Sequence, residues 1–502
     1  MTLQRVSRNW AVLRLVTYKL VVALVLTGLF HDSLLGQTVW NGSTGGSWGV
    51  DGNWTPNLVP TQLEDVTINA GQAIIGAALV AESRALLVGD TSSGALRIES
   101  GGSLTSREAT LGGQFGSTGS LTVNASTWNI LGDTVVGLAG NGTLVIESGS
   151  SVESLGSVYV AQGAGSVGNL TIDGGSSELI AQGGVDVGDP NASSTGILNV
   201  RNNGKLSTPF LGDIQINGTG VVNVESGSSI VTDLFTAEAG SLLVNHGTID
   251  DPNGAFISLV ANSGTLSGSG SQSVDLTDFG VLAPSAVSPI DDSGVYTINA
   301  SWDQFSGSEL QIELGGLSNG GGNKSLTSFD WIDATGDVTL AGGIDVQLID
   351  GFTLSFQQEF EIVNVGGTLS GGFVGLAEES VVTVLGGMPV LISYQGGDGN
   401  DIVLYTPSEF EADFDSDNDV DSDDLGQWQG DYASNGMSDA DGDGDSDGLD
   451  FLTWQKQHGY GIAPLSSAST PVPEPAVGSM ILLTTVITFL RRAERARSLY
   501  QS

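Results

Sequence analysis

Apolar and polar residues alternate with a period of two in a unit that recurs between residues 94 and 250. Apolar side chains occupy every second position, as at Leu144 and Ile146 or at Leu170 and Ile172. This period is typical of a β-strand with one buried face, and the Ser-Gly, Gly-Gly and Asn-Gly pairs that follow supply the positive φ of a tight turn. Seven instances begin 20 to 28 residues apart: GALRIESGGSL from Gly94, GSLTVNASTW from Gly119, GTLVIESGSSV from Gly142, GNLTIDGGSSEL from Gly168, GILNVRNNGKL from Gly196, GVVNVESGSSI from Gly220 and GSLLVNHGTI from Gly240.

A second short strand is expected between units, as at Val158–Ala161 and Val185–Gly188. Strand, turn, strand and turn, repeated at about one coil's length, is the pattern of a β-solenoid, in which each coil stacks on the last and buries an apolar column. We therefore predict a mainly β protein whose body is a right-handed parallel β-helix. A β-sandwich built as a meander is the alternative.

The units resemble the repeats shared by autotransporter passenger domains and by exported proteins that carry a PEP-CTERM tail. The resemblance covers residues 85–250 and implies an exported β-solenoid. The preceding segment, residues 38–84, contains TVWNGSTGGSWGVDGNWTPNLVP and looks like the entry of such passengers, so an N-terminal β cap is expected there. Trp40, Trp48 and Trp54 either close the open end of the solenoid or form a sugar-stacking platform.

Residues 251–406 resemble the β-rich region that follows such repeats, and we expect a β-rich C-terminal cap or a continued helix. GGDGND, at 396–401, is similar to part of a calcium-binding nonapeptide, but a single copy predicts a turn. Strands are expected at Leu310–Leu314, Asp337–Leu340, Ile344–Leu348, Glu359–Val365, Leu391–Tyr394 and Ile402–Tyr405.

Two acidic segments begin 26 residues apart, DFDSDNDVDSDDLGQWQ at Asp413 and DADGDGDSDGLDFLTWQ at Asp439. Their acidic residues fall at positions 1, 3, 5, 7, 9 and 12, the offsets of an EF-hand-like loop around Ca²⁺, which prefers six to eight oxygen ligands. We predict two calcium ions. Position 7 would offer its backbone carbonyl and the others their side chains: Asp413, Asp415, Asp417, Asp419, Asp421 and Asp424 in loop one, and Asp439, Asp441, Asp443, Asp445, Asp447 and Asp450 in loop two.

Each loop is expected to turn sharply at its sixth position, where Asn418 and Gly444 tolerate positive φ. A short helix should follow each loop. The spacing of Leu425 and Trp428, and of Phe451 and Trp454, places each pair on one helical face.

Two such loops, each with only an exiting helix, resemble a type I dockerin module, expected over residues 407–463. The resemblance implies a small α-helical module that docks on a cohesin-like protein domain and often brings polysaccharide-degrading enzymes together. The chain departs from the pattern at Ser446, where the loop usually has an apolar residue, and at positions 10 and 11, which are Ser422 and Asp423 in one copy and Gly448 and Leu449 in the other. An acidic spacer without a defined fold is the alternative.

Both ends of the chain are expected to be targeting segments. Residues 1–37 combine a basic start, the apolar LVVALVLTGLF and a small residue, Gly36, at a plausible cleavage point, which predicts a secretory signal peptide; a retained membrane anchor is the alternative. Residues 464–502 contain VPEP, an apolar run from Ala476 to Leu490 and then an Arg cluster. They resemble a PEP-CTERM sorting tail, which implies processing by an exosortase.

Composition narrows the possible partners. The net charge is −42, and eight of the 15 Lys and Arg residues lie in the two terminal segments, so nucleic acid is excluded as a partner. The absence of Cys excludes disulfides and disfavours a zinc site. Membrane contact is expected only through the terminal segments, and the chain should reach the cell surface or extracellular matrix of a Gram-negative-type bacterium.

Nothing in the sequence places a Ser or Cys nucleophile beside one of the three His residues. We expect a non-catalytic exported scaffold with a calcium-dependent docking module. Extracellular polysaccharide is a further candidate partner of this scaffold. The alternative is a carbohydrate-active enzyme, a polysaccharide lyase or glycoside hydrolase, with Asp250 and Asp251 or Asp291 and Asp292 as its carboxylates. A smooth Ser/Thr/Asn surface would favour the scaffold, and a groove with converging Asp, Arg and Lys would favour the enzyme.

Overall fold

The computed structural model describes residues 36–461, except 191–192, 252–258, 285–292 and 322. Half of the chain is strand and 6% is helix, which confirms the mainly β prediction. The described residues form two compact units. The first extends to Glu409 but does not include Gly386–Met388, and the second consists of Gly386–Met388 and the residues from Phe410 onward. No described helix has the length and apolarity to cross a membrane. Most of the predicted signal peptide and all of the predicted sorting tail lie outside the described residues.

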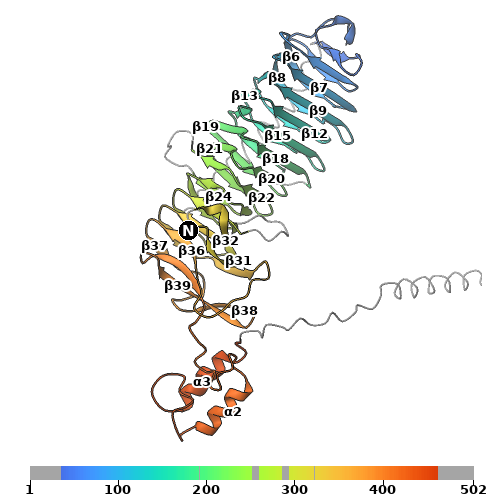
Figure 1. Ribbon diagram of the computed structural model, residues 1–502. Coiled ribbons are helices and arrows are strands. Elements are labelled where there is room, and N and C mark those ends of the chain that lie inside the picture. The colour runs from blue at the N-terminus through green and yellow to red at the C-terminus, as the bar shows by residue number, and fades with distance from the viewer. Residues whose placement is uncertain (1–35, 191–192, 252–258, 285–292, 322, 462–502) are drawn as a thin grey trace, which may run out of the picture. The chain divides into compact units, whose positions relative to one another are not determined.

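The first unit is a β-solenoid of about ten turns (Figure 1). One of its two sheets has 14 strands, and from β2 to β31 every neighbouring pair is parallel. Parallel pairing between successive coils rules out the meander sandwich. The strands of this sheet are β2 (Gly46–Ser47), β5 (Gln72–Ile75), β7 (Ser93–Glu99), β9 (Thr118–Asn124), β12 (Asn141–Glu147), β15 (Val167–Asp173), β18 (Thr195–Arg201), β20 (Val221–Val224), β22 (Leu242–Asn245), β25 (Thr265–Ser267), β28 (Val281–Ala283), β31 (Glu309–Asn319), β32 (Thr327–Phe329) and β35 (Gly343–Leu348).

The other sheet has 26 strands and runs along the solenoid in two branches that meet at long strands such as β8 and β19. A coil such as β12–β13–β14 therefore has three sides. The strands are β1 (Gln37–Trp40), β3 (Trp54–Thr55), β4 (Asp65–Ile68), β6 (Val80–Val88), β8 (Ser103–Leu111), β10 (Thr127–Ile130), β11 (Thr134–Val136), β13 (Ser151–Ser154), β14 (Val158–Val160), β16 (Glu178–Ala181), β17 (Val185–Val187), β19 (Lys205–Ile216), β21 (Ser229–Ala237), β23 (Thr248–Asp250), β24 (Leu259–Asn262), β26 (Ser271–Gln272), β27 (Asp275–Asp278), β29 (Val295–Ile298), β30 (Trp302–Gln304), β33 (Trp331–Ala334), β34 (Val338–Leu340), β36 (Glu359–Val365), β37 (Leu369–Gly371), β38 (Val381–Leu385), β39 (Met388–Gly396) and β40 (Asp401–Tyr405).

The alternating apolar residues of the repeats form the core. Leu121, Leu144 and Leu170 lie in register on β9, β12 and β15, and all three are buried. Burying a leucine side chain contributes about 2 kcal/mol, and one coil cannot bury its column without a neighbour on each side. Stacking therefore follows from the sequence period.

The glycines that open the six repeats from Gly94 to Gly220 are required by close approach of the backbone. Gly119, Gly142 and Gly168 pair with one another across β9, β12 and β15. A Cβ on Gly142 would lie 2.1 Å from the backbone nitrogen of Gly137, and one on Gly168 would lie 2.3 Å from the carbonyl oxygen of Val136. Any side chain at these positions would push the coil open.

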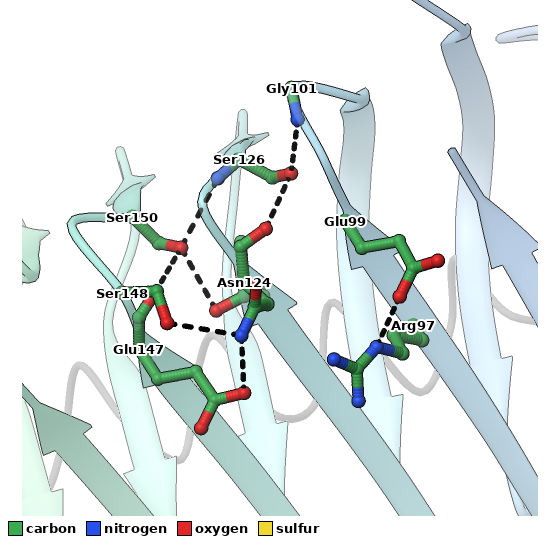
Figure 2. A network of polar contacts seen from close by, with 9 residues as sticks. Arg97, Glu99, Gly101, Asn124, Ser126, Glu147, Ser148 and Ser150 are labelled. Carbon is green, nitrogen blue, oxygen red and sulfur yellow. Dashed lines mark hydrogen bonds and ion pairs between the residues drawn. The ribbon is translucent and has the colours of Figure 1, made fainter. Parts of the chain in front are cut away.

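The serines of the turns join successive coils (Figure 2). The hydroxyl of Ser150 accepts the backbone N–H of Ser126 at 3.2 Å and donates to the carbonyl of Glu147 at 2.6 Å. One coil earlier, the hydroxyl of Ser126 accepts the N–H of Gly101 and donates to the carbonyl of Asn124. Each turn serine therefore satisfies a backbone donor of the preceding coil and an acceptor of its own.

The N-terminal tryptophans lie inside the first coil. Trp48 and Trp54 are fully buried, Trp40 is 3% exposed, and the rings of Trp40 and Trp48 each contact Trp54 edge-on. The indole N–H of Trp54 donates to the carbonyl of Trp48 at 2.7 Å. Buried ring faces cannot stack on a sugar, so these three residues do not form a sugar-stacking platform.

The solenoid continues past the clear repeats, because parallel pairing reaches β36 and β37. The remaining strands close the unit in antiparallel fashion: β40 pairs with β36 on one side and with β39 on the other. The turn between β39 and β40 is the GGDGND segment, as predicted.

The second unit is a small helical module. Its helices are α2 (Ser422–Asp431) and α3 (Gly448–Gln457), and each directly follows one of the acidic segments. Two short 3₁₀ helices belong to the first unit, η1 (Asp51–Asn53) and η2 (Lys324–Leu326).

Candidate metal centre

The acidic segments of the second unit bring their carboxylates together in two matching groups per loop. In loop one, oxygens of Asp413, Asp415 and Asp424 lie within 4.8 Å of one another, and Asp424 also groups with Asp419 and Asp421. The same positions recur in loop two, where the groups are Asp439 with Asp441 and Asp450, and Asp445 with Asp447 and Asp450. These clusters could bind a metal.

The aspartate at position 12 organises each loop. Asp450 is fully buried; its Oδ1 accepts the N–H of Ala440 at 2.7 Å and its Oδ2 accepts the N–H of Asp447 at 2.6 Å. Asp447 is the N-cap of α3, so the two aspartates form a reciprocal capping box. Asp424 and Asp421 repeat this arrangement at the start of α2. The helix start and the loop are therefore fixed by the same carboxylate.

The aspartate at position 1 shapes the turn of the loop. Asp439 accepts the N–H groups of Asp443 at 3.0 Å and Gly444 at 2.9 Å. The sixth position has positive φ in both loops, 72° at Asn418 and 97° at Gly444, as the sequence predicted. The fourth position also has positive φ, at Ser416 and Gly442, which the sequence reasoning missed.

Positions 5 and 7 differ from the sequence-based assignment. The side chains of Asp417 and Asp443 stand outside the carboxylate groups, and each accepts the N–H of the residue two positions on. The side chains of Asp419 and Asp445, assigned only a backbone carbonyl, lie inside them. Every one of the twelve aspartates remains a candidate ligand, and which atoms bind is a prediction.

Like charges are crowded in both loops. Partial desolvation, followed by the charge of Asp424, raises the pKa of Asp415, and desolvation followed by Asp417 raises the pKa of Asp419. In loop two the charge of Asp443 is the largest cause that raises the pKa of Asp445. The ionised forms of Asp415, Asp419 and Asp445 are therefore disfavoured, and a bound cation would reverse this effect.

The donor set fits a hard divalent cation. It consists only of oxygen atoms, which Ca²⁺ and Mg²⁺ prefer over the softer metals. Calcium–oxygen distances of 2.3–2.6 Å place two oxygens on one ion at most about 5 Å apart, and the carboxylate groups fall inside that limit. At position 12, both carboxylate oxygens of the aspartate already accept backbone N–H groups. Their remaining lone pairs are available to the ion.

The two loops are joined by tryptophans that the sequence reasoning placed only on a helix face. Trp428, on the helix after loop one, donates its indole N–H to the carbonyl of Asp447 in loop two at 2.9 Å. Trp454, on the helix after loop two, donates to the carbonyl of Asp421 in loop one at 2.8 Å. The ring of Phe451 stacks on both indoles. The signal in the sequence was the identical offset of the two tryptophans within the 26-residue repeat.

Ser446, the polar departure in loop two, is fully buried and satisfied. Its hydroxyl accepts the N–H of Ser438 at 3.1 Å, and Ser438 in turn donates to Asp431 at the end of α2. A hydrogen-bonded serine thus replaces the apolar contact made by Val420 at the same position of loop one.

The carboxylates considered for catalysis give no assembled site within the described residues. Asp250 ends β23 and accepts the hydroxyl of Ser273 at 2.8 Å, while Asp251 follows it directly in the chain. Asp291 and Asp292 lie outside the described residues.

One feature of the first unit was missed from the sequence: a shallow hollow of about 710 Å³ beside β36 and β40. Glu359, Glu361, Glu378 and Glu379 line it together with Tyr405. Burial, followed by the charge of Asp401, raises the pKa of Glu361. The Glu-x-Glu alternation at 359–361 was the available signal, because it places both side chains on one face of β36.

A search of protein-family models found no family that matches the chain, and a search of curated proteins found no relative.

Proposed function

We propose that this protein is a non-catalytic, exported β-solenoid scaffold that binds two calcium ions through its C-terminal module and docks by that module on a cohesin-like domain. The module, residues 410–461, would be a type I dockerin. The terminal segments would direct export, with a PEP-CTERM tail processed by an exosortase, and place a right-handed solenoid at the cell surface or in the extracellular matrix.

The observation that carries the proposal is the equivalence of the two loops. Position 12 in each is a buried aspartate that accepts N–H groups from its own loop and caps its own helix. An acidic spacer without a fold has no reason to repeat a capping box, a positive φ at position six and a carboxylate cluster 26 residues apart. The repetition favours a built cation site, and the all-oxygen donor set favours calcium.

The surface of the solenoid supports the scaffold over the enzyme. Two outward columns run along the sheet from β9 to β22 without a charged residue. They are Ser120, Thr143, Asn169, Ile197, Val221 and Leu242, and beside them Thr122, Val145, Thr171, Asn199, Asn223 and Val244. Hydrolysis or elimination on a polysaccharide needs carboxylates or cationic groups at the reacting bond. These two columns supply none; the third outward column of the same strands carries Glu147, Asp173 and Arg201, of which Asp173 and Arg201 are joined in an ion pair. A neutral extracellular polysaccharide is the glycan such a face would tolerate.

The exposed faces of α2 and α3 differ, and this difference bears on docking. α3 presents Leu449 and Leu452, which are 52% and 48% exposed and lie on one side of the helix. The equivalent positions of α2 are Asp423 and Gly426. At these equivalent positions a protein partner gains apolar burial from α3 and not from α2, so we propose that α3 is the docking helix.

Calorimetric titration of the full chain with Ca²⁺ tests the metal, and a binding assay tests the partner. We expect two ions to bind, and immobilised protein to capture a cohesin-like domain from the envelope fraction in calcium but not in EDTA. Leu449→Asp should abolish capture while two ions still bind; Asp423→Asn is the matched control on α2 and should leave both unchanged. Absence of divalent-ion uptake at millimolar Ca²⁺ would refute the function as proposed.

A further inference from the structure

We propose that Trp428 and Trp454 are positioning residues that couple the two metal loops, so that an ion in one loop raises the affinity of the other. The inference rests on the proposed calcium binding and adds to it a mechanism of cooperativity. It starts from a reciprocal pair of hydrogen bonds: each indole N–H is held by the carbonyl of the aspartate at position 9 of the opposite loop.

The path from one loop to the other is short. Asp450 belongs to both carboxylate groups of loop two and caps α3. Trp454 lies four residues later, one turn along the same helix, and its indole N–H reaches the carbonyl of Asp421. Asp421 belongs to a carboxylate group of loop one and is the N-cap of α2. An ion that holds Asp450 in place therefore also fixes the indole N–H of Trp454, which donates to the carbonyl of Asp421.

The return path uses the equivalent residues. Asp424 belongs to both groups of loop one and caps α2, and Trp428 lies one turn along α2. Its indole N–H holds the carbonyl of Asp447, the N-cap of α3. Because the two paths are equivalent, either loop can be the first to bind.

A second pair of reciprocal bonds reinforces the first. The backbone N–H of Ala433, just beyond α2, donates to the carbonyl of Ser446 in loop two, and the N–H of Gly459, just beyond α3, donates to the carbonyl of Val420 in loop one. Positions 8 and 9 of each loop are thus both held by the segment that follows the other loop. Ala433 and Gly459 both have positive φ, which turns their N–H groups across the module.

The two loops are coupled because each ion, on binding, must order its loop and the helix that follows it. A loop of crowded carboxylates resists closing, because three carboxylates, such as those of Asp439, Asp441 and Asp450, offer oxygens within 4.8 Å of one another. When one loop is already closed by its ion, the helix that follows it and its tryptophan are fixed, and the other loop has less left to order. The binding free energies are then linked, with the same factor in both directions.

The experiment is a calcium titration of the full chain by calorimetry, repeated in variants. Asp439→Ala disables loop two and reports the affinity of loop one alone. We expect it to be about tenfold weaker than the affinity of loop one beside an occupied loop two. Trp454→Phe keeps the ring stacked on Phe451 but removes the N–H, and it should shrink that difference to about threefold or less. Trp428→Phe, compared with Asp413→Ala, should show the same effect on loop two.

The matched control is Trp331→Phe in the solenoid, whose indole nitrogen has no hydrogen-bond partner in the structure and which should leave both affinities unchanged. A merely structural role of Trp454 would weaken both loops equally and leave their ratio intact; that result would overturn the coupling. Two ions that bind independently in the unaltered chain would overturn it as well, while leaving the proposed function in place. Failure to bind calcium at all would instead remove the proposed function on which the inference rests.

Discussion

Oδ1 of Asp450 lies 2.7 Å from the backbone nitrogen of Ala440, so the last aspartate of loop two holds the beginning of that loop. Asp424 makes the same contact with Phe414 in loop one, at 2.6 Å. Loop closure therefore depends on one buried carboxylate in each loop, and we expect cation binding to depend on the same carboxylate.

Replacing Asp439 and Asp450 together with Ala should reduce calcium uptake by one ion. Asp439 holds the turn and Asp450 closes the loop, so loop two loses both its ligands and its shape. Calorimetric stoichiometry measures the effect. Asp423→Ala, which removes an exposed carboxylate outside the clusters, should still bind two ions; two equal sites in the double variant would contradict the assignment of the ligands.

Chelation should open the module and spare the solenoid. Without a cation, two carboxylates about 4 Å apart repel by roughly 4 kcal/mol at an effective dielectric constant of 20, and this repulsion opposes the closing of each loop. Limited proteolysis in EDTA should cut within residues 411–460 and leave the β-solenoid intact. Protease resistance of this segment that does not change on chelation would argue against metal-dependent folding.

Asp278 should make the solenoid more stable in mild acid. Its carboxyl is fully buried between coils, where it accepts the side-chain amide of Asn262 and the N–H of Gly280, while its Oδ2 has no partner. Burial raises the pKa of Asp278 from 3.8 to about 6. The folded state therefore binds this proton more tightly than the unfolded state, and stability rises as pH falls from 7 through 6 toward 4, by up to about 3 kcal/mol.

Urea unfolding at several pH values measures that dependence. Asp278→Asn should raise the urea midpoint at pH 7 and flatten its change between pH 7 and 4. Asp303→Asn, an exposed position of the next coil, is the control and should keep the slope. An unaltered slope in Asp278→Asn would show that other groups cause it.

Gly142→Ala should destabilise the solenoid by at least about 2 kcal/mol, because the added methyl group overlaps the backbone of Gly137 and Val136. Thermal unfolding followed by circular dichroism measures the loss. Gly76→Ala is the matched substitution, since a Cβ there meets nothing within 4 Å, and its melting temperature should remain close to that of the unaltered protein. Equal melting temperatures in the two variants would refute close approach as the reason for glycine.

The sequence was most informative where the same residue pattern recurs in every copy of a repeat. Alternation at Leu144 and Ile146 gave the buried face of β12 directly, and repetition gave the stack. The beginnings of α2 and α3 also followed from the loops, because position 9 is a capping residue as well as an acid. Contacts between residues that are distant in the chain could not be predicted. Neither the hydrogen bond from Trp454 to Asp421 nor the burial of Trp48 has a local signature in the sequence.

The later coils show a different limit. The column continues through Leu266, Leu282 and Leu310 in register, although the Gly-led unit has faded from the sequence. Buried polar groups such as Asn262 and Asp278 replace part of the apolar pattern there, and the side-chain amide of Asn262 donates to Asp278 and to the carbonyl of Val281 in the neighbouring coil. Periodicity cannot detect a core that is held by polar partners at a distance of one coil.

Register between strands β9, β12 and β15 is identical: Thr118 faces Asn141, which faces Val167. Excising residues 141–166 would therefore let Thr118 meet Val167 with glycines, leucines and turn serines still aligned. Each coil adds about 4.8 Å to the length of the solenoid, so whole coils can be removed or added while their neighbours stay in register. Evolution can change the reach of such a protein by gene duplication or deletion alone, without redesigning either end.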